Sequence, residues 1–138
     1  MSGTTSRGQS AVSFSHISLA SGAGIAGVLV VFLLAQVSGT NFTVSAPPAV
    51  TSPLPWWLFA TYAVGAGAAM FLVVPLSQRF ARPRRVGIGA ALLGLAAMTP
   101  APFLVTEDFL TIFWLTASHV ALVTPLILLC SRLPVTGR

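Results

Sequence analysis

The sequence predicts an all-α fold, an integral membrane four-helix bundle with both chain ends in the cytoplasm. Three observations support this prediction: an apolar composition, four apolar runs of membrane-spanning length, and arginines confined to alternate loops. Hydrophobic residues make up 55% of the 138 residues and charged residues 7%, whereas a soluble domain carries about 25% charged residues. This composition excludes a soluble enzyme or nucleic-acid-binding domain, and it is too apolar for a disordered chain.

Crossing a bilayer core of about 30 Å takes about 20 residues of helix, and four uncharged runs reach that length. These runs are 17–37, 56–76, 86–105 and 109–130. Strands of membrane barrels instead alternate in polarity over about ten residues, so continuous apolar runs favour helices. We expect one four-helix domain at 17–132, with cytoplasmic tails at 1–16 and 133–138.

The first run, 17–37, has a cleaved signal peptide as its alternative interpretation, with Arg7 as the charged region before it. Its 21 residues exceed the roughly 7–15 residues of a signal-peptide core, so a retained membrane helix is the preferred interpretation. The loop at 38–55 that follows contains four prolines and is expected to be extended. Trp56 and Trp57 begin the second run, where indole rings favour the membrane boundary.

The third run is interrupted by Pro100 and Pro102. Prolines remove backbone donors and free the carbonyls one turn earlier. The simpler interpretation is an early helix end followed by an extended run into the loop. The functional interpretation is that the freed carbonyls near Pro100 help form a ligand site open to the outer side, because non-helical backbone at this depth must be buried or line a wet cavity.

The fourth run contains His119, the only ionisable side chain expected near the membrane midplane. It is either a neutral imidazole bonded to a neighbouring helix, or a group that transfers protons or binds a ligand. Thr116 lies on the same helix face, and Thr116, Asn41, Pro100, Trp114 and Tyr62 are the candidate ligand-binding residues. No metal site is expected, because His16 lies at the membrane boundary, and no cofactor is implied. Cys130 is the single cysteine, which excludes an intrachain disulfide.

Asp108 and Glu107 are the only acidic residues. Asp108 is well placed to cap the fourth helix, where a carboxylate favours the positive end of the helix dipole. As a second catalytic candidate, Asp108 would need His119 within reach, but eleven helical residues separate the two by about 16 Å.

The arginines predict the orientation. All seven basic residues are arginines, and they fall in the N-terminal tail, the loop after the second run, and the C-terminal tail. Four crossings bring these segments to one side, which the positive-inside rule assigns to the cytoplasm. The absence of lysine suggests a GC-rich bacterial genome and therefore the bacterial cytoplasmic (inner) membrane. The basic loop 79–85 is expected to contact anionic lipid head groups rather than nucleic acid.

Small residues recur four positions apart in the first three runs, which lets other helices approach closely. The pairs are Ala20/Gly24, Ala23/Gly27, Ala63/Gly67, Gly65/Ala69, Gly87/Ala91 and Ala90/Gly94. Packing within one bundle is the simpler interpretation. A surface for a homo-oligomer is the alternative.

Three motifs resemble a family of uncharacterised actinobacterial four-helix membrane proteins. They are the segment 39–44 after the first helix, the basic loop 79–85, and 114–120 in the fourth helix, and the chain closes with 131–134. Members of that family carry Met-His where this chain has Ser118-His119, so the neighbour of the histidine differs. The resemblance covers nearly the whole chain from Ile17. It implies a fold and a topology, and no activity.

Three functions compete. The first is a membrane protein that binds a lipophilic ligand or a partner subunit, with membrane lipids around it. The second is a membrane-embedded isomerase or cyclase with His119 as general acid/base and Asn41 or Asp108 as a polar contact. The third is a small dimeric efflux transporter, which the absence of an acid inside the four runs disfavours. Binding is the preferred interpretation.

Overall fold

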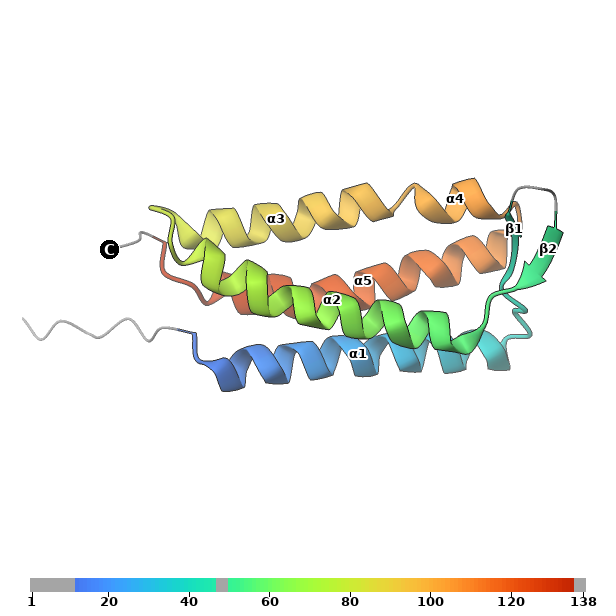
Figure 1. Cartoon of the computed structure of the whole chain (residues 1–138), viewed down its shortest axis with the longest axis horizontal. Helices are drawn as coiled ribbons and strands as arrows, with labels where there is room; N and C mark the ends of the chain where they lie inside the picture. Colours follow the sequence, from blue (N-terminus) through green and yellow to red (C-terminus); the bar gives the residue numbers. More distant parts are fainter. Residues whose placement is uncertain (1–11, 47–49, 136–138) are drawn as a thin grey trace, which may run out of the picture.

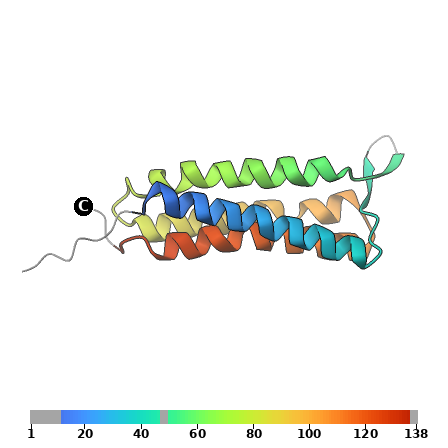
Figure 2. The same ribbon diagram turned by 90° about the horizontal axis from the view of Figure 1, so that it is seen from below.

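The computed structural model describes residues 12–46 and 50–135 and shows a four-helix bundle with a small hairpin at one end (Figure 1). The elements are α1 Phe14–Val37, β1 Thr43–Ala46, β2 Val50–Pro53, α2 Trp56–Ser77, α3 Pro83–Met98, α4 Ala101–Val105 and α5 Phe109–Ser131. Figure 2 shows the long helices running lengthwise beside one another. The all-α bundle expected from the sequence is confirmed.

Each of the four crossings is long and apolar enough to span a membrane, with α3 and α4 together forming the third. Their lengths of 22–24 residues correspond to about 33–36 Å of helix. Large apolar side chains cover the outside: Leu19, Leu72 and Leu93 are each more than 70% exposed. Lipid tails rather than water suit such a surface, so the chain is a multi-pass membrane protein.

Two helices begin three residues before their apolar runs. The first begins at Phe14 rather than at 17, so it includes His16. The third begins at Pro83 rather than at 86, with the proline in its first turn. A proline fits there because the first N–H groups of a helix have no helical acceptor. Hydropathy alone missed these turns because they are polar or charged.

The third crossing is broken but remains helical. Met98 ends α3, and the helix resumes at Ala101 with Pro102 in the first turn. The expected extended run after Pro100 is therefore wrong, since α4 occupies it. Pro100 has no N–H to donate to the carbonyl of Ala96, which explains the interruption, and Pro102 fits the start of a new helix.

The loop between α1 and α2 is extended, as expected, and its two strands pair antiparallel, with Thr43 opposite Pro53. Phe42 precedes the hairpin with φ of 45° and is 1% exposed. Its ring lies 4.8 Å from that of Phe59 and 5.8 Å from that of Phe32. These rings, together with Ala35, form an aromatic cluster that fixes the hairpin to α1 and α2. The prolines predicted extension but not this burial, and Pro47 and Pro48 lie outside the described residues.

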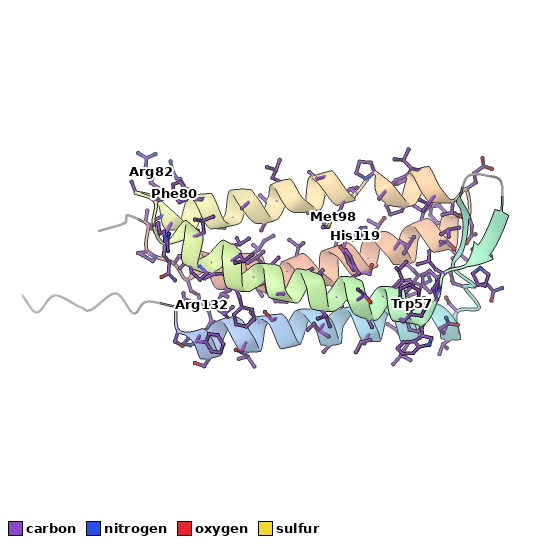
Figure 3. The ribbon with its side chains drawn as sticks, viewed as in Figure 1. Trp57, Phe80, Arg82, Met98, His119 and Arg132 are labelled. Carbon is purple, nitrogen blue, oxygen red and sulfur yellow. The ribbon has the colours of Figure 1, made fainter. Side chains whose placement is uncertain are left out.

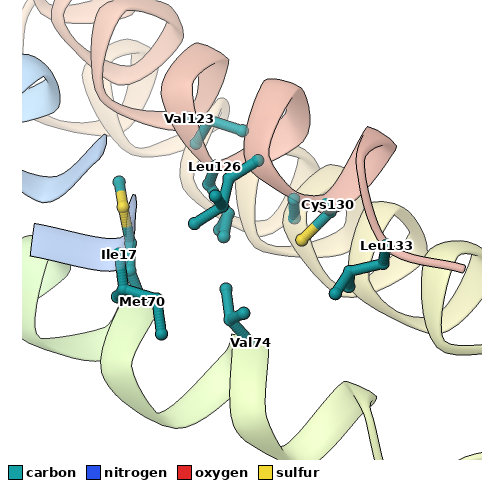
Figure 4. Close-up of a cluster of buried hydrophobic side chains, with 9 residues drawn as sticks. Ile17, Met70, Val74, Val123, Leu126, Cys130 and Leu133 are labelled. Atoms are coloured by element: carbon teal, nitrogen blue, oxygen red, sulfur yellow. The ribbon is translucent and has the colours of Figure 1, made fainter. Parts of the chain in front are cut away.

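The fourth crossing, α5, packs against each of the other three crossings. It contacts α1 and α3, which lie on opposite sides of it, and also α2 (Figure 1). Met70 and Val74 of α2 face Val123, Leu126 and Cys130 of α5 in the main hydrophobic cluster (Figure 4). Between α1 and α2 the hydroxyl of Ser21 donates to the carbonyl of Gly67 over 3.0 Å.

The small-residue positions divide into two groups. An added Cβ on Gly24 would lie 3.3 Å from Leu122, and one on Gly67 would lie 3.2 Å from Ile25. These glycines serve packing inside the bundle. Gly65 and Gly94 would meet no atom within 4 Å, so intramolecular packing does not require glycine there.

The described arginines gather at one end of the molecule. Arg82 and Arg132 lie at the end where α1 begins and α5 finishes, and Trp57 lies at the other (Figure 3). We call these the arginine end, which holds Arg79, Arg82, Arg84, Arg85 and Arg132, and the hairpin end. Glu107 and Asp108 connect α4 to α5 at the hairpin end. The even number of crossings matches the prediction, while Arg7 and Arg138 lie outside the described residues.

Candidate functional site

Three buried polar atoms of α5 have no hydrogen-bond partner within the described part of the chain. They are Nδ1 of His119, Oγ1 of Thr116 and Nε1 of Trp114. His119 is only 9% exposed. Buried polar groups are nearly always paired, and an unpaired group destabilises the fold by about 1–3 kcal/mol. The three polar atoms without a partner therefore lie within less than two turns of α5.

Tyr62 of α2 contacts both His119 of α5 and Met98 of α3. Its ring lies 5.3 Å from the imidazole of His119 in an edge-to-face arrangement. Its hydroxyl donates to Sδ of Met98, the last residue of α3, over 3.1 Å. The structure therefore joins two of the sequence candidates, Tyr62 and His119. Sequence reasoning missed Met98, since nothing in the local pattern distinguishes it from other apolar residues.

An apolar cleft of about 140 Å³ lies beside this group, between α2, α3 and α5. Its lining residues are Ala66, Ala69, Met70, Val73, Ala90, Ala91, Gly94, Met98, Leu122, Val123 and Leu126. Ala66 and Leu122 lie one helical turn from Tyr62 and His119, so the cleft runs from that group towards the arginine end. Ala69 and Ala90 are exposed at its rim, which opens it to the surrounding lipid.

The remaining ligand-binding candidates lie apart from the cleft. Trp114 packs against the aromatic cluster, with its ring 5.1 Å from that of Phe113. Asn41 is exposed in the loop before β1, and Pro100 lies at the break between α3 and α4. Thr116 is one turn before His119, and none of these candidates, His119 and Tyr62 included, is among the residues that line the cleft. Of the seven candidates, the structure brings Tyr62 and His119 together, one helical turn from the cleft-lining residues Ala66 and Leu122.

Asp108 caps α5, as the sequence predicted. Its Oδ2 accepts from the backbone N–H of Thr111 over 2.9 Å and also from the Thr111 hydroxyl. These hydrogen bonds lower the pKa of the Asp108 carboxyl below its usual value. Its carboxylate is thus engaged at the hairpin end, about 16 Å along the helix from His119, and the two do not form a catalytic pair.

The cap predicts a pH dependence. The lowered pKa means that Asp108 contributes stability above the unfolded pKa of about 3.9, and that this contribution is lost as pH falls through the lower folded value. Asp108→Asn should keep the cap but lose this dependence below about pH 4, because asparagine caps helices and does not titrate there. Asp108→Ala should be less stable at neutral pH. Thermal unfolding in detergent between pH 3 and 7 measures both, and identical pH profiles for wild type and Asp108→Asn would contradict the assignment.

No group of three His, Cys, Asp or Glu that could hold a metal ion occurs in residues 12–46 and 50–135. His16 lies in the first turn of α1 at the arginine end, whereas His119 lies in the middle of α5. Cys130 is buried against Gly87 and Ser77. The chemistry offered at the cleft is therefore hydrogen bonding by an imidazole and a phenol beside an apolar surface.

Comparisons with protein-family models, with curated proteins and with solved structures find no match to this chain. The resemblance to an actinobacterial four-helix family stays a prediction. The case for function therefore depends on the geometry of the bundle.

Proposed function

We propose that this small membrane protein binds a lipophilic molecule in the cleft between α2, α3 and α5, with a polar group of that molecule directed towards His119. The observation that supports this most is that the cleft begins one helical turn from His119, a buried histidine whose Nδ1 has no partner among the described residues. Ligand sites are commonly apolar hollows with a few convergent polar groups, and this arrangement has both features.

The size of the cleft limits the ligand. A dry cavity of about 150 Å³ accommodates a molecule of benzene size, and this cleft measures about 140 Å³. It suits one ring or a branched apolar segment rather than a whole lipid. The rest of the ligand would extend between Ala69 and Ala90 into the bilayer. A hydroxyl or carbonyl group on the inner part would reach the hydrogen-bonding atoms of Tyr62 and His119.

The experiment uses a cleft-filling variant and a matched control. Gly94 lines the cleft, and a side chain added there meets no atom within 4 Å. Gly94→Leu should therefore fill the cleft without disturbing the bundle. Gly65→Leu adds the same side chain at a position that is equally free but outside the cleft. The probe is hexadecanol carrying a photoreactive diazirine close to the hydroxyl end, which is the part expected inside the cleft, incubated with purified protein in detergent.

Cross-links in the wild type should concentrate on the cleft-lining parts of α2 and α3. Gly94→Leu should reduce them to the level seen on lipid-facing residues, and Gly65→Leu should leave them unchanged. Equal labelling of all three proteins, or labelling spread evenly over the exposed helix faces, would refute the proposal.

The enzyme alternative uses the same histidine, since a bound lipophilic substrate beside His119 is its starting complex. The efflux alternative finds no added support in the positions of the described residues. Partner subunits or further copies of the chain are compatible with the open small-residue positions such as Gly65. We further propose that the arginine end faces the cytoplasm of a bacterial cell, because short basic loops are retained on that side.

A further inference from the structure

A second hollow, of about 210 Å³, lies between α1 and α5 at the arginine end. Its lining alternates between the two helices: His16, Leu19, Ala20 and Ala23 from α1, and Pro125, Leu128, Leu129 and Arg132 from α5. Steps of three and four residues place each set along one helix face. The result is a groove with polar side chains at its mouth and apolar ones along its length.

The helices α1 and α5 cross closely at Gly27 and Ala121, one turn beyond the groove. An added Cβ on Gly27 would lie 3.5 Å from Cβ of Ala121 and 3.6 Å from its carbonyl oxygen. One turn nearer the arginine end, Ala23 and Pro125 line the hollow. From His16 to Ala23 the groove is seven residues long, which is about 10 Å along a helix.

The charge at the mouth has no acidic side chain near it within residues 12–46 and 50–135. Arg132 is exposed at the end of α5, and its guanidinium is a cation with several N–H donors. The chain has only two acidic residues, and both lie at the hairpin end. No carboxylate side chain of the described residues therefore competes with an external anion for Arg132. A guanidinium binds phosphate oxygens through paired N–H donors.

We propose that this groove is a binding site for one anionic glycerophospholipid. The phosphodiester pairs with Arg132 at the mouth, and one acyl chain lies along Leu19, Ala23 and Leu128 towards the crossing. A zwitterionic or neutral lipid would fill the apolar part equally well but would not compensate the arginine charge. The groove involves the face of α5 that contacts α1, whereas the cleft beside His119 involves α2 and α3, so this lipid site is separate from the proposed ligand site.

Native mass spectrometry of the full chain in mixed micelles tests the proposal, with equal amounts of phosphatidylglycerol and phosphatidylcholine as probes. The wild type should retain one phosphatidylglycerol in preference to phosphatidylcholine. Arg132→Gln should lower that preference about five-fold, which is the effect of one basic residue near an anionic surface. Arg79→Gln removes the same charge from the arginine end outside the groove and should change the preference little.

A second pair of variants tests the apolar part. Ala23→Leu should fill the groove and reduce retention of both lipids, while Ala26→Leu, which is exposed on α1 outside the groove, should retain them. Inorganic phosphate should not displace the lipid, because it lacks the acyl chain. Equal retention of the two lipids by the wild type, or equal losses in Arg79→Gln and Arg132→Gln, would overturn the proposal.

Discussion

Replacing Gly87 with alanine is expected to destabilise the bundle by about 1–3 kcal/mol, the range for adding a methyl group to a filled core. An added Cβ at Gly87 would lie 2.7 Å from Sγ of Cys130, 3.1 Å from Cβ of Cys130 and 3.4 Å from the Ser77 hydroxyl. Cys130 is fully buried, so its thiol has little space to move into. The new methyl group must push α3 away from α5.

The measurement is reversible unfolding in mixed micelles of increasing denaturing-detergent content. Gly65→Ala is the matched control, because its methyl group meets no atom within 4 Å and should leave stability unchanged or slightly raised. Cys130→Ala in the Gly87→Ala background should recover much of the loss by removing Sγ, so the two substitutions should be strongly non-additive. Simple additivity of the two single variants would show that Gly87 and Cys130 do not contact each other.

Replacing His119 with leucine is expected to abolish the preference for polar over apolar ligands while leaving the fold intact. One hydrogen bond contributes about 0.5–1.5 kcal/mol, so the wild type should bind hexadecanol up to about ten-fold more tightly than hexadecane, and the variant should bind both equally. The free variant should be as stable as the wild type or more stable, because leucine removes a buried nitrogen that has no partner.

Competition against the photoreactive probe measures both affinities, and the same unfolding assay measures stability. His119→Asn is the informative control, because its amide group occupies nearly the position of Nδ1 and should restore part of the preference. If His119→Leu bound the alcohol as well as the wild type, the histidine would have no part in recognition. A large loss of stability in His119→Leu would instead identify the imidazole as a structural group.

Sequence reasoning predicted the four crossings well because their cause is local. Any uncharged run of this length forms a helix in lipid, since its backbone must bond internally. The starts of α1 and α3 were placed too late because His16, Arg84 and Arg85 are helical without being apolar. The hairpin and the burial of Phe42 depend on rings from α1 and α2, and no local pattern records them.

The candidate site was predictable only in part. His119 stands out in the sequence as a polar group in an apolar run, and Asp108 stands out as a cap. Neither the cleft near His119 nor the contact between Tyr62 and Met98 could be predicted from the sequence, because both depend on how the helices pack. The glycines show the same limit: Gly87 and Gly94 have similar sequence surroundings, yet one is in close contact with Cys130 and the other borders free space.

The aromatic cluster at the hairpin end bears on how a guest molecule would arrive. Phe42, Phe59 and Ala35 are almost fully covered and close the tops of α1 and α2, whereas the cleft opens sideways at Ala69 and Ala90. A ligand would then enter the cleft from the hydrocarbon layer of the bilayer and not from the aqueous phase. The fraction of clefts that hold a ligand would depend on the mole fraction of the ligand among the lipids. Adding inert lipid at constant total volume would therefore release the bound ligand.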